Sequence, residues 1–415
     1  MLNQDILREA TRLTHAGQLA EATALLQRML RGERASDAAS RTPARISLPG
    51  REPPTIDANA KDVEETEPAH LARAPSAPAR RLRPLFARAK DGSWLGMRGA
   101  KRNPPYPSEI APEGAKFIED TYSNPAGTRS YKLFVPSGYQ GQPLPLVVML
   151  HGCTQSPDDF AAGTRMNFIA EEQTCFVVYP AQRSDANQSK CWNWFRTADQ
   201  RRGEGEPSLI AGITRRVMRD YSVDRRRVYV GGLSAGAAAA AILGATYPDL
   251  YAAVGIHSGL ACGAATDMSS AFAAMRQGGG PGRSVISSGG PPVPAIIFHG
   301  DRDTMVHPNN GDQVREQAIG TMNTQKKVRR GQIPGGHAYT RTTHTDAGGR
   351  EILEQWNIHG AGHAWSGGST SGSYTDPLGP DATREMLRFF LVHSLPHQTA
   401  SVSSIETSRV NSSPT

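Results

Sequence analysis

The sequence contains little cysteine and no long hydrophobic run, and each absence removes a class of protein. Four cysteines among 415 residues are too few for a disulfide-rich scaffold. Their positions match no zinc-ligand spacing. We expect neither a metal nor another cofactor, because the serine chemistry argued below needs none. No run of about 20 apolar residues occurs, which predicts no transmembrane helix. The first residues, MLNQDILREA, lack the apolar stretch of a secretory signal, so the default expectation is the cytoplasm.

Aromatic residues make up only 7% of the chain and hydrophobic residues 38%, which predicts that part of it is not packed. That part is residues 32–105, rich in Ala, Pro, Arg and Ser and without a sustained period, which we interpret as a disordered linker. Its second half is basic, but its only aromatic residues of stacking type are Phe86 and Trp94, and no nucleic-acid motif accompanies them. A solvated tether is therefore preferred to a nucleic-acid site. Residues 396–415 read as a disordered polar tail.

Residues 1–31 show apolar side chains at helical spacing on either side of Ala16-Gly17. The pattern resembles one tetratricopeptide-type helical hairpin. A single hairpin of this kind cannot bury its apolar face alone, so it must pack on the main domain, on another copy or on a foreign surface.

Residues 106–395 alternate apolar runs with helical patterns, which indicates an α/β fold with a mostly parallel sheet. The run LPLVVML at Leu144–Leu150 has the continuous apolar character of a strand buried on both faces. We expect the other strands at residues 129–135, 175–179, 228–230, 252–257, 295–299 and 352–358, and helices at 158–172, 208–221, 235–245, 310–322 and 381–393. The Gly- and Ser-rich stretch 262–292 reads as a mobile insertion near the site.

A G-x-S-x-G motif at Gly232–Gly236 lies between the strand at 228–230 and the Ala-rich helix at 235–245. The sharp turn from strand to helix crowds the backbone, and the glycines relieve that crowding while the Ser234 hydroxyl is pushed out of the sheet. The helix behind it points backbone N–H groups at whatever Ser234 attacks. We therefore interpret Ser234 as a nucleophile; the alternative is a tight turn without chemistry.

A serine nucleophile needs a base, and the base needs an orienting acid. Asp303 follows the strand at 295–299 and is the preferred acid, because Asp301 stands directly in the turn, where an Asp often serves the backbone. His363, in a glycine-flanked loop after the strand at 352–358, is the preferred base, with His359 second.

The turn His151-Gly152-Cys153 follows the strand at Leu144–Leu150. A His-Gly turn at this point is expected to donate one oxyanion-hole N–H, that of Cys153, and the residue after the nucleophile, Ala235, donates the other. His151 is interpreted as a ring that holds the turn.

Six segments carry a resemblance: LHGCTQ at Leu150–Gln155, YPAQ, CWNWF, GGLSAGAAAA, FHGDRD and GHAWSGG. In this order they resemble the poly(3-hydroxybutyrate) depolymerase family of esterases, over residues 115–393. The resemblance implies an α/β-hydrolase with Ser234, Asp303 and His363 as its triad. It is less specific for substrate, because similar sequences include feruloyl and acetylxylan esterases. No signal peptide or separate polymer-binding domain is visible, which weakens the case for attack on crystalline polymer.

Cys153 and Cys191 lie in two of these segments and either form a disulfide that stiffens the oxyanion turn or stay reduced, as is usual in the cytoplasm. Trp192, Trp194 and Trp365 are candidates for the wall of an acyl pocket, with core packing as the alternative.

The sequence thus predicts a serine carboxylester hydrolase acting on 3-hydroxybutyrate polyester, its oligomers or short-chain acyl esters. A feruloyl or acetylxylan esterase is the alternative enzyme. The alternative that is not an enzyme is a polymer-granule-binding protein that uses its N-terminal region. The hydrolase itself is also a candidate for association with polymer granules, through the hairpin and the basic linker.

Overall fold

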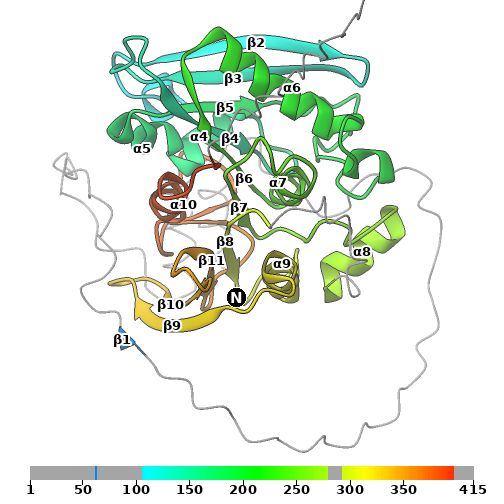
Figure 1. Ribbon diagram of the computed structural model, residues 1–415, viewed down its shortest axis with the longest axis vertical. Helices are drawn as coiled ribbons and strands as arrows, with labels where there is room; N and C mark the ends of the chain where they lie inside the picture. Colours follow the sequence, from blue (N-terminus) through cyan, green and yellow to red (C-terminus); the bar gives the residue numbers. More distant parts are fainter. Residues whose placement is uncertain (1–60, 63–104, 279–291, 397–415) are drawn as a thin grey trace, which may run out of the picture. The chain divides into compact units, whose positions relative to one another are not determined.

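The computed structural model describes residues 61–62, 105–278 and 292–396 (Figure 1). The predicted hairpin at 1–31, nearly all of the linker and of the tail, and most of the second half of the predicted insertion lie outside the described residues.

The described residues form a sheet in the order β1-β9-β10-β11-β8-β7-β6-β4-β5-β3-β2 (Figure 1). The six central strands, from β11 to β5, run parallel, and antiparallel strands extend both edges. The predicted α/β fold with a mostly parallel sheet is confirmed. The strands are β1 (Lys61–Asp62), β2 (Lys116–Asn124), β3 (Gly127–Val135), β4 (Leu144–Leu150), β5 (Phe176–Pro180), β6 (Val223–Leu233), β7 (Ala253–His257), β8 (Ala295–Gly300), β9 (Gln325–Gln332), β10 (Ala338–Thr345) and β11 (Glu351–Ile358), with a separate pair β12 (Trp365–Ser366) and β13 (Thr375–Asp376).

Helices cover both faces of the sheet (Figure 1). On one face α4, α5 and α10 pack through Phe160, Met166 and Phe390. On the other, α6 and α7 pack through side chains such as Ile213 and Leu243, with Val314 of α9 in the same cluster. The helices are α3 (Pro107–Ile110), α4 (Pro157–Thr164), α5 (Met166–Gln173), α6 (Gly205–Asp220), α7 (Ala235–Thr246), α8 (Met268–Gln277), α9 (Asn309–Ile319) and α10 (Ala382–Leu391), with a 3-10 turn at Thr197–Gln200.

The register of the parallel strands brings their carboxyl ends to one edge. Leu150 pairs with Gly232, Leu233 with His257, and Ile358 with Gly300. The loops that follow β4, β6, β8 and β11 therefore start at the same edge, where open α/β sheets bind their ligands. Cys153, Asp303 and His363 lie in these loops, and Ser234 and Ala235 lie where β6 turns into α7.

Two local predictions were wrong. The single helix expected at 158–172 is two helices, because Arg165 takes a left-handed backbone (φ 56°) between α4 and α5. The insertion expected at 262–292 contains α8, whose N-terminus is capped by the Asp267 side chain, which accepts a hydrogen bond from the Ser270 N–H. Glycine and serine around α8 concealed its apolar side chains at helical spacing, Met268, Phe272 and Met275.

Candidate active site

Ser234 stands at a strained turn between β6 and α7. Its φ of 58° and ψ of −119° lie outside the regions that non-glycine residues favour. The turn is anchored to the neighbouring strand β7, because the Ser234 N–H donates to the His257 carbonyl at 2.9 Å. Position 236 must be glycine, because a Cβ there would clash with the backbone carbonyl oxygens of Leu150 and His151. The strain and the tight packing place the hydroxyl at the carboxyl edge of the sheet, as the motif predicts.

Asp303 and His363 come together from the loops after β8 and β11. Nδ1 of His363 lies 2.7 Å from Oδ2 of Asp303, and both side chains are buried. The other oxygen, Oδ1, accepts the backbone N–H groups of Met305 (2.9 Å) and Val306 (2.8 Å). Burial of Asp303 raises the pKa of its carboxyl, but the hydrogen bond from His363 and the other donors outweigh burial and leave that pKa below its ordinary value. The carboxyl is thus an ionised acceptor and the ring the donor.

Ser234 and His363 line one small pocket. The rest of its wall is mostly apolar and includes Trp194, Met275 and Met305. Cys153 and Ala235, the two predicted oxyanion donors, lie on the same wall. The full lining is Cys153, Trp194, Ser234, Ala235, Leu260, Met275, Met305, Val306 and His363. An apolar pocket with one nucleophile, one base and two backbone donors is suited to an uncharged acyl group.

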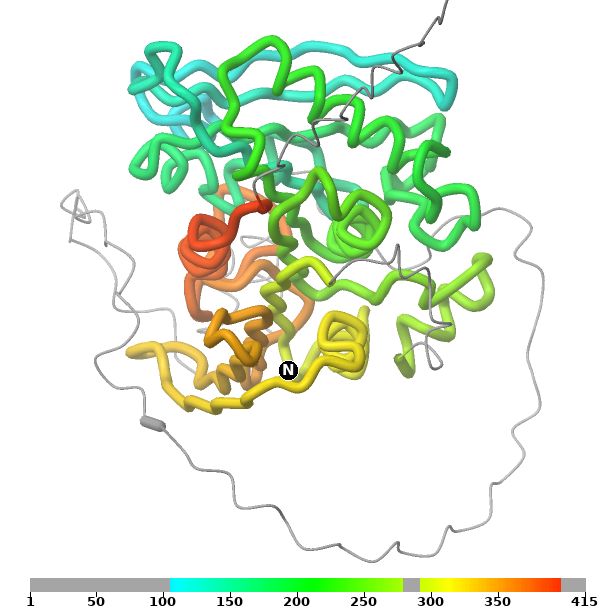
Figure 2. The backbone as a smooth tube through the Cα atoms, in the orientation of Figure 1, coloured from blue at the N-terminus to red at the C-terminus, as the bar shows by residue number. Residues whose placement is uncertain are grey.

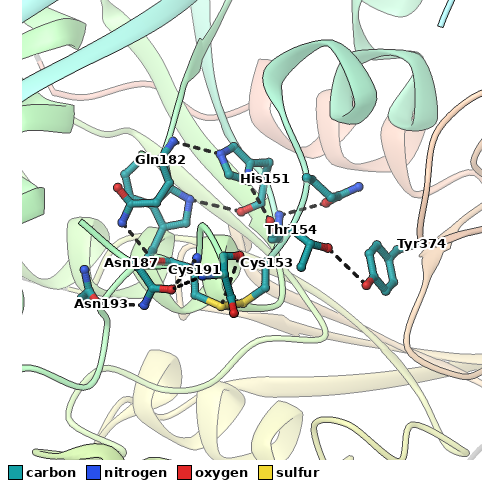
Figure 3. The surroundings of a disulfide bond; sticks show 12 residues. His151, Cys153, Thr154, Gln182, Asn187, Cys191, Asn193 and Tyr374 are labelled. Carbon is teal, nitrogen blue, oxygen red and sulfur yellow. Dashed lines mark hydrogen bonds between the residues drawn. A yellow bond between two sulfur atoms is a disulfide. The ribbon is translucent and has the colours of Figure 1, made fainter. Parts of the chain in front are cut away.

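The turn after β4 is tied down by side chains (Figure 3). The His151 ring accepts the Gln182 N–H at Nε2 (3.1 Å), and the His151 carbonyl accepts the Trp192 indole N–H (3.1 Å). The Gly152 N–H donates to the Gln155 side chain at 2.9 Å. His151 therefore holds the turn and takes no part in the triad, as predicted.

A disulfide joins Cys153 to Cys191, with Cα atoms 4.2 Å apart (Figure 3). Of the two alternatives left by the sequence, the structure shows the paired one. The bond ties the expected oxyanion donor to the loop that follows β5. Cys175 and Cys262 are free and buried.

His257 and His299 are two buried histidines near the triad that do not belong to it. Burial lowers the pKa of His257 to about 3. Its neutral ring accepts the Ser366 N–H at Nε2 (3.0 Å) and stacks between Phe298 and Trp365. His299 donates from Nε2 to the Val306 carbonyl (2.8 Å), and that nitrogen lies 3.5 Å from Asp303 Oδ2. Burial also lowers the pKa of His299. His299 thus supports the loop that carries the acid, and His257 supports the backbone just after the base.

The second-choice acid and base pair with each other. Asp301 contacts Nδ1 of His359 at 3.0 Å and accepts the Gly360 N–H at 2.7 Å, and both side chains are exposed. Asp301 thus serves the backbone, as its place in the turn predicts. The pair joins the loop of the acid to the loop of the base.

The structure corrects two of the three tryptophan candidates. Trp192 is fully buried and its indole N–H donates to the His151 carbonyl, and Trp365 is buried against Phe160 with its indole N–H donating to Thr383 (2.9 Å). Both rings pack in the hydrophobic core, where their polar N–H groups find partners. Only Trp194 lines the pocket.

The sequence interpretation missed four pocket residues, Leu260, Met275, Met305 and Val306. Met305 and Val306 stand within three residues of Asp303, which was a signal of proximity to the site. Met275 was hidden because α8 was taken for part of a mobile insertion. Among the described residues, no group of three His, Cys, Asp or Glu side chains is placed to hold a metal ion. No helix in the part of the chain that the structure describes has the length and apolar character needed to cross a membrane.

Residues 129–330 match the family model described as "Esterase PHB depolymerase". The chain is 35% identical over 250 residues to "Poly(3-hydroxyalkanoate) depolymerase C" of Paucimonas lemoignei, a match that covers 58% of this chain and 59% of that protein. It is 27% identical over 212 residues to "Probable acetylxylan esterase A" of Aspergillus clavatus, covering 48% of this chain and 67% of that one. The chain thus spans little more than half of the depolymerase's length.

Among solved structures, "Acetyl xylan esterase from Aspergillus awamori" resembles the fold, with a TM-score of 0.50 and 21% identity. The match covers 60% of this chain and 93% of that one. At this identity the likeness supports the α/β-hydrolase fold alone.

Proposed function

We propose that this protein is a serine carboxylester hydrolase of the PHB depolymerase family, because residues 129–330 match that family's model. The observation that carries the proposal is that Ser234 and His363 line the same apolar pocket, while Asp303 is hydrogen-bonded to Nδ1 of His363. Nucleophile, orienting acid and base then occur in the order Ser, Asp, His along the chain, each after a strand of the parallel sheet.

The reaction follows from this geometry. Asp303 holds the Nδ1–H tautomer of His363, so Nε2 accepts the Ser234 proton as Oγ attacks the ester carbonyl. The N–H groups of Cys153 and Ala235 stabilise the oxyanion. The ester C–O bond breaks, His363 returns the proton to the leaving alcohol, and an acyl-enzyme remains. His363 then takes a proton from water, hydroxide attacks the acyl carbon, and release of the acid restores Ser234.

We propose 3-hydroxybutyrate oligomers, amorphous polyester or short-chain acyl esters as substrates. The similarity to a bacterial poly(3-hydroxyalkanoate) depolymerase supports the polyester, and the small apolar pocket supports a short uncharged acyl group. An acetylxylan- or feruloyl-type esterase is the second candidate, favoured by the similarity to a fungal acetylxylan esterase.

The test compares purified wild type with Ser234→Ala on four substrates: a p-nitrophenyl butyrate ester, 3-hydroxybutyrate trimer, amorphous polyester and methyl ferulate. Release of 3-hydroxybutyrate that Ser234→Ala abolishes would support the polyester. Serine-dependent cleavage of ferulate alone would move the function to plant-wall esters. Turnover by Ser234→Ala equal to wild type would overturn the mechanism.

We further propose that residues 1–105 attach the enzyme to polymer granules in the cytoplasm. The support is the resemblance of residues 1–31 to a helical hairpin that needs a surface, and the basic linker behind it. Deleting residues 1–105 should abolish granule binding and leave hydrolysis of the trimer intact. Retained binding would assign it to the hydrolase domain and overturn the proposal.

The Cys153–Cys191 disulfide opposes a cytoplasmic location, because cytosolic thiols are normally kept reduced. Rapid alkylation in intact cells followed by mass spectrometry tests the location. A reduced pair supports the cytoplasm, and a fully oxidised pair would instead indicate an oxidising compartment.

A further inference from the structure

Glu206 is a buried carboxylate at a position the mechanism does not use. It lies in the first turn of α6, with only 6% of the residue exposed. Its own N–H donates to the Asp199 side chain at 2.8 Å. Burial raises the pKa of Glu206, with the neighbouring Asp199 charge acting in the same direction. A buried acid of this kind is costly unless several donors satisfy it.

Every contact of the Glu206 carboxylate is made by a donor. Oε2 accepts the Asn193 backbone N–H at 2.6 Å, and Oε1 accepts the Asn193 side-chain amide at 2.7 Å. The Gln182 amide and, at 3.4 Å, the Arg129 guanidinium also donate to Oε1. Four N–H donors match an ionised carboxylate, which accepts and never donates.

These donors belong to the segment that holds the oxyanion turn. The Gln182 amide also donates to the Cys191 carbonyl at 2.9 Å, and the Gln182 N–H donates to His151 Nε2 (Figure 3). Cys191 is bonded through sulfur to Cys153, and the neighbouring Trp192 donates to the His151 carbonyl. Glu206 thus fixes residues 182–193 at Gln182 and Asn193, and that segment in turn holds the His151 ring, the His151 carbonyl and the Cys153 side chain.

We propose that Glu206 is a positioning residue for the oxyanion hole, setting the Cys153 N–H through the segment 182–193. The inference rests on the proposed function, since it assumes that an oxyanion forms at this turn. The carboxylate makes no hydrogen bond to a pocket residue, and the inference is that it acts through the turn. Its loss should therefore weaken stabilisation of the tetrahedral state more than binding of the substrate.

The test uses Glu206→Gln, which keeps the shape but turns one oxygen acceptor into a donor. The new NH₂ must face one of the N–H groups that now donate to the carboxylate. We expect kcat for p-nitrophenyl butyrate to fall about ten-fold or more, with KM within about two-fold. The inhibition constant of a trifluoromethyl ketone, whose adduct with Ser234 carries an oxyanion, should rise by the same factor as kcat falls.

The matched control is Glu385→Gln. Glu385 is also a buried acid in the first turn of a helix, α10, and contacts Arg388 at 2.7 Å on the opposite face of the sheet. We expect it to lower the urea midpoint without changing kcat. An equal loss of kcat in both variants, or a folded Glu206→Gln with unchanged kcat and inhibitor binding, would overturn the proposal.

If Glu206→Gln does not fold, Gln182→Met serves in its place. It keeps Glu206 and removes the amide that joins Glu206 to the Cys191 carbonyl. The same loss of kcat at constant KM is expected, and unchanged kcat would count against the inference.

Labelling of Ser234 by a fluorophosphonate separates the inference from the proposed function, because it requires no natural substrate. No labelling of wild type would defeat the proposed function and the inference with it. Wild-type labelling that Glu206→Gln leaves undiminished would defeat the inference alone, and labelling slowed about ten-fold would support it.

Discussion

Nδ1 of His363 donates to Oδ2 of Asp303 across 2.7 Å, and this contact decides which nitrogen of the ring serves as base. With Nδ1 occupied as a donor, Nε2 carries the lone pair that can accept the Ser234 proton. The carboxylate cannot swing away, because its other oxygen is held by the Met305 and Val306 N–H groups. The acid is thus fixed by backbone, and the base is fixed by the acid.

Asp303→Asn should lower kcat by about 10⁴-fold, because an amide favours the wrong tautomer of the base. The amide oxygen of the substituted side chain can still accept the Met305 and Val306 N–H groups. In that orientation the NH₂ group of the amide faces His363. Steady-state hydrolysis of p-nitrophenyl butyrate measures the loss, and circular dichroism checks the fold.

Asp301→Asn is the control for this variant, since Asp301 and Asp303 flank the same turn. Asp301 contacts His359 and the Gly360 N–H at an exposed position, so the variant should keep kcat within about ten-fold of wild type. A larger loss in Asp301→Asn than in Asp303→Asn would show that the acid has been assigned to the wrong residue.

Two buried histidines should make the protein less stable in mild acid. Burial lowers the pKa of His151 to about 4 and of His257 to about 3, against about 6.5 in the unfolded chain. Each ring accepts a backbone N–H at Nε2, a contact that protonation would destroy. Below pH 6.5 the unfolded state therefore binds protons that the folded state does not, and stability falls as the pH falls.

Linkage gives the size of this effect as about 2 kcal/mol of unfolding free energy for each ring between pH 7 and pH 5. Urea unfolding at the two pH values measures it. His257→Gln should reduce the pH dependence of the unfolding free energy. Equal pH dependence in wild type and His257→Gln would contradict the assignment.

The motifs predicted where the triad residues lie because each of them stands in the turn or loop that follows a strand. Ser234, Asp303 and His363 could be placed since a parallel sheet brings the carboxyl ends of its strands to one edge. The acid was separated from Asp301 by a local argument about turns, and the contacts of Asp301 agree with that argument.

The pocket wall could not be predicted in the same way, because it depends on long-range packing. Trp192 and Trp194 stand two residues apart, yet one is bonded into the core and the other faces the pocket. Nothing in the spacing reveals that Trp192 reaches the His151 carbonyl. The buried role of Glu206 was equally hidden, since its partners come from segments far away in the sequence.

Removing the disulfide should lower stability by about 4 kcal/mol, the chain-entropy estimate for a closed loop of 38 residues. The variant is Cys153→Ala with Cys191→Ala, and urea unfolding measures the change. Before reduction, the urea-denatured wild type should show two titratable thiols, Cys175 and Cys262. Four thiols would show that the bond is absent from the purified protein. If a reductant destabilises the double variant as much as the wild type, then the loss of stability on reduction does not come from this disulfide.

Met275→Ala should shift the preference of the enzyme toward longer acyl chains. Met275 reaches the pocket from α8, which lies beside α9 in Figures 1 and 2 and is tied to the loop before α9 by the His307 N–H, donating to the Met275 carbonyl at 2.7 Å. Because the helix is anchored, truncating the side chain should open space instead of letting the backbone collapse into it. The ratio of kcat/KM for p-nitrophenyl octanoate to that for the butyrate should rise roughly ten-fold, the usual effect of a few methylene contacts.

Met268→Ala is the matched control, because Met268 lies on the same helix but is exposed and does not line the pocket. It removes the same side chain from α8 and should leave the ratio unchanged. If both variants raise the ratio equally, then looser packing of α8 explains the effect. If Met275→Ala folds and keeps the wild-type ratio, then the acyl chain of the substrate does not extend toward α8, and the wall formed by Trp194 becomes the next place to test.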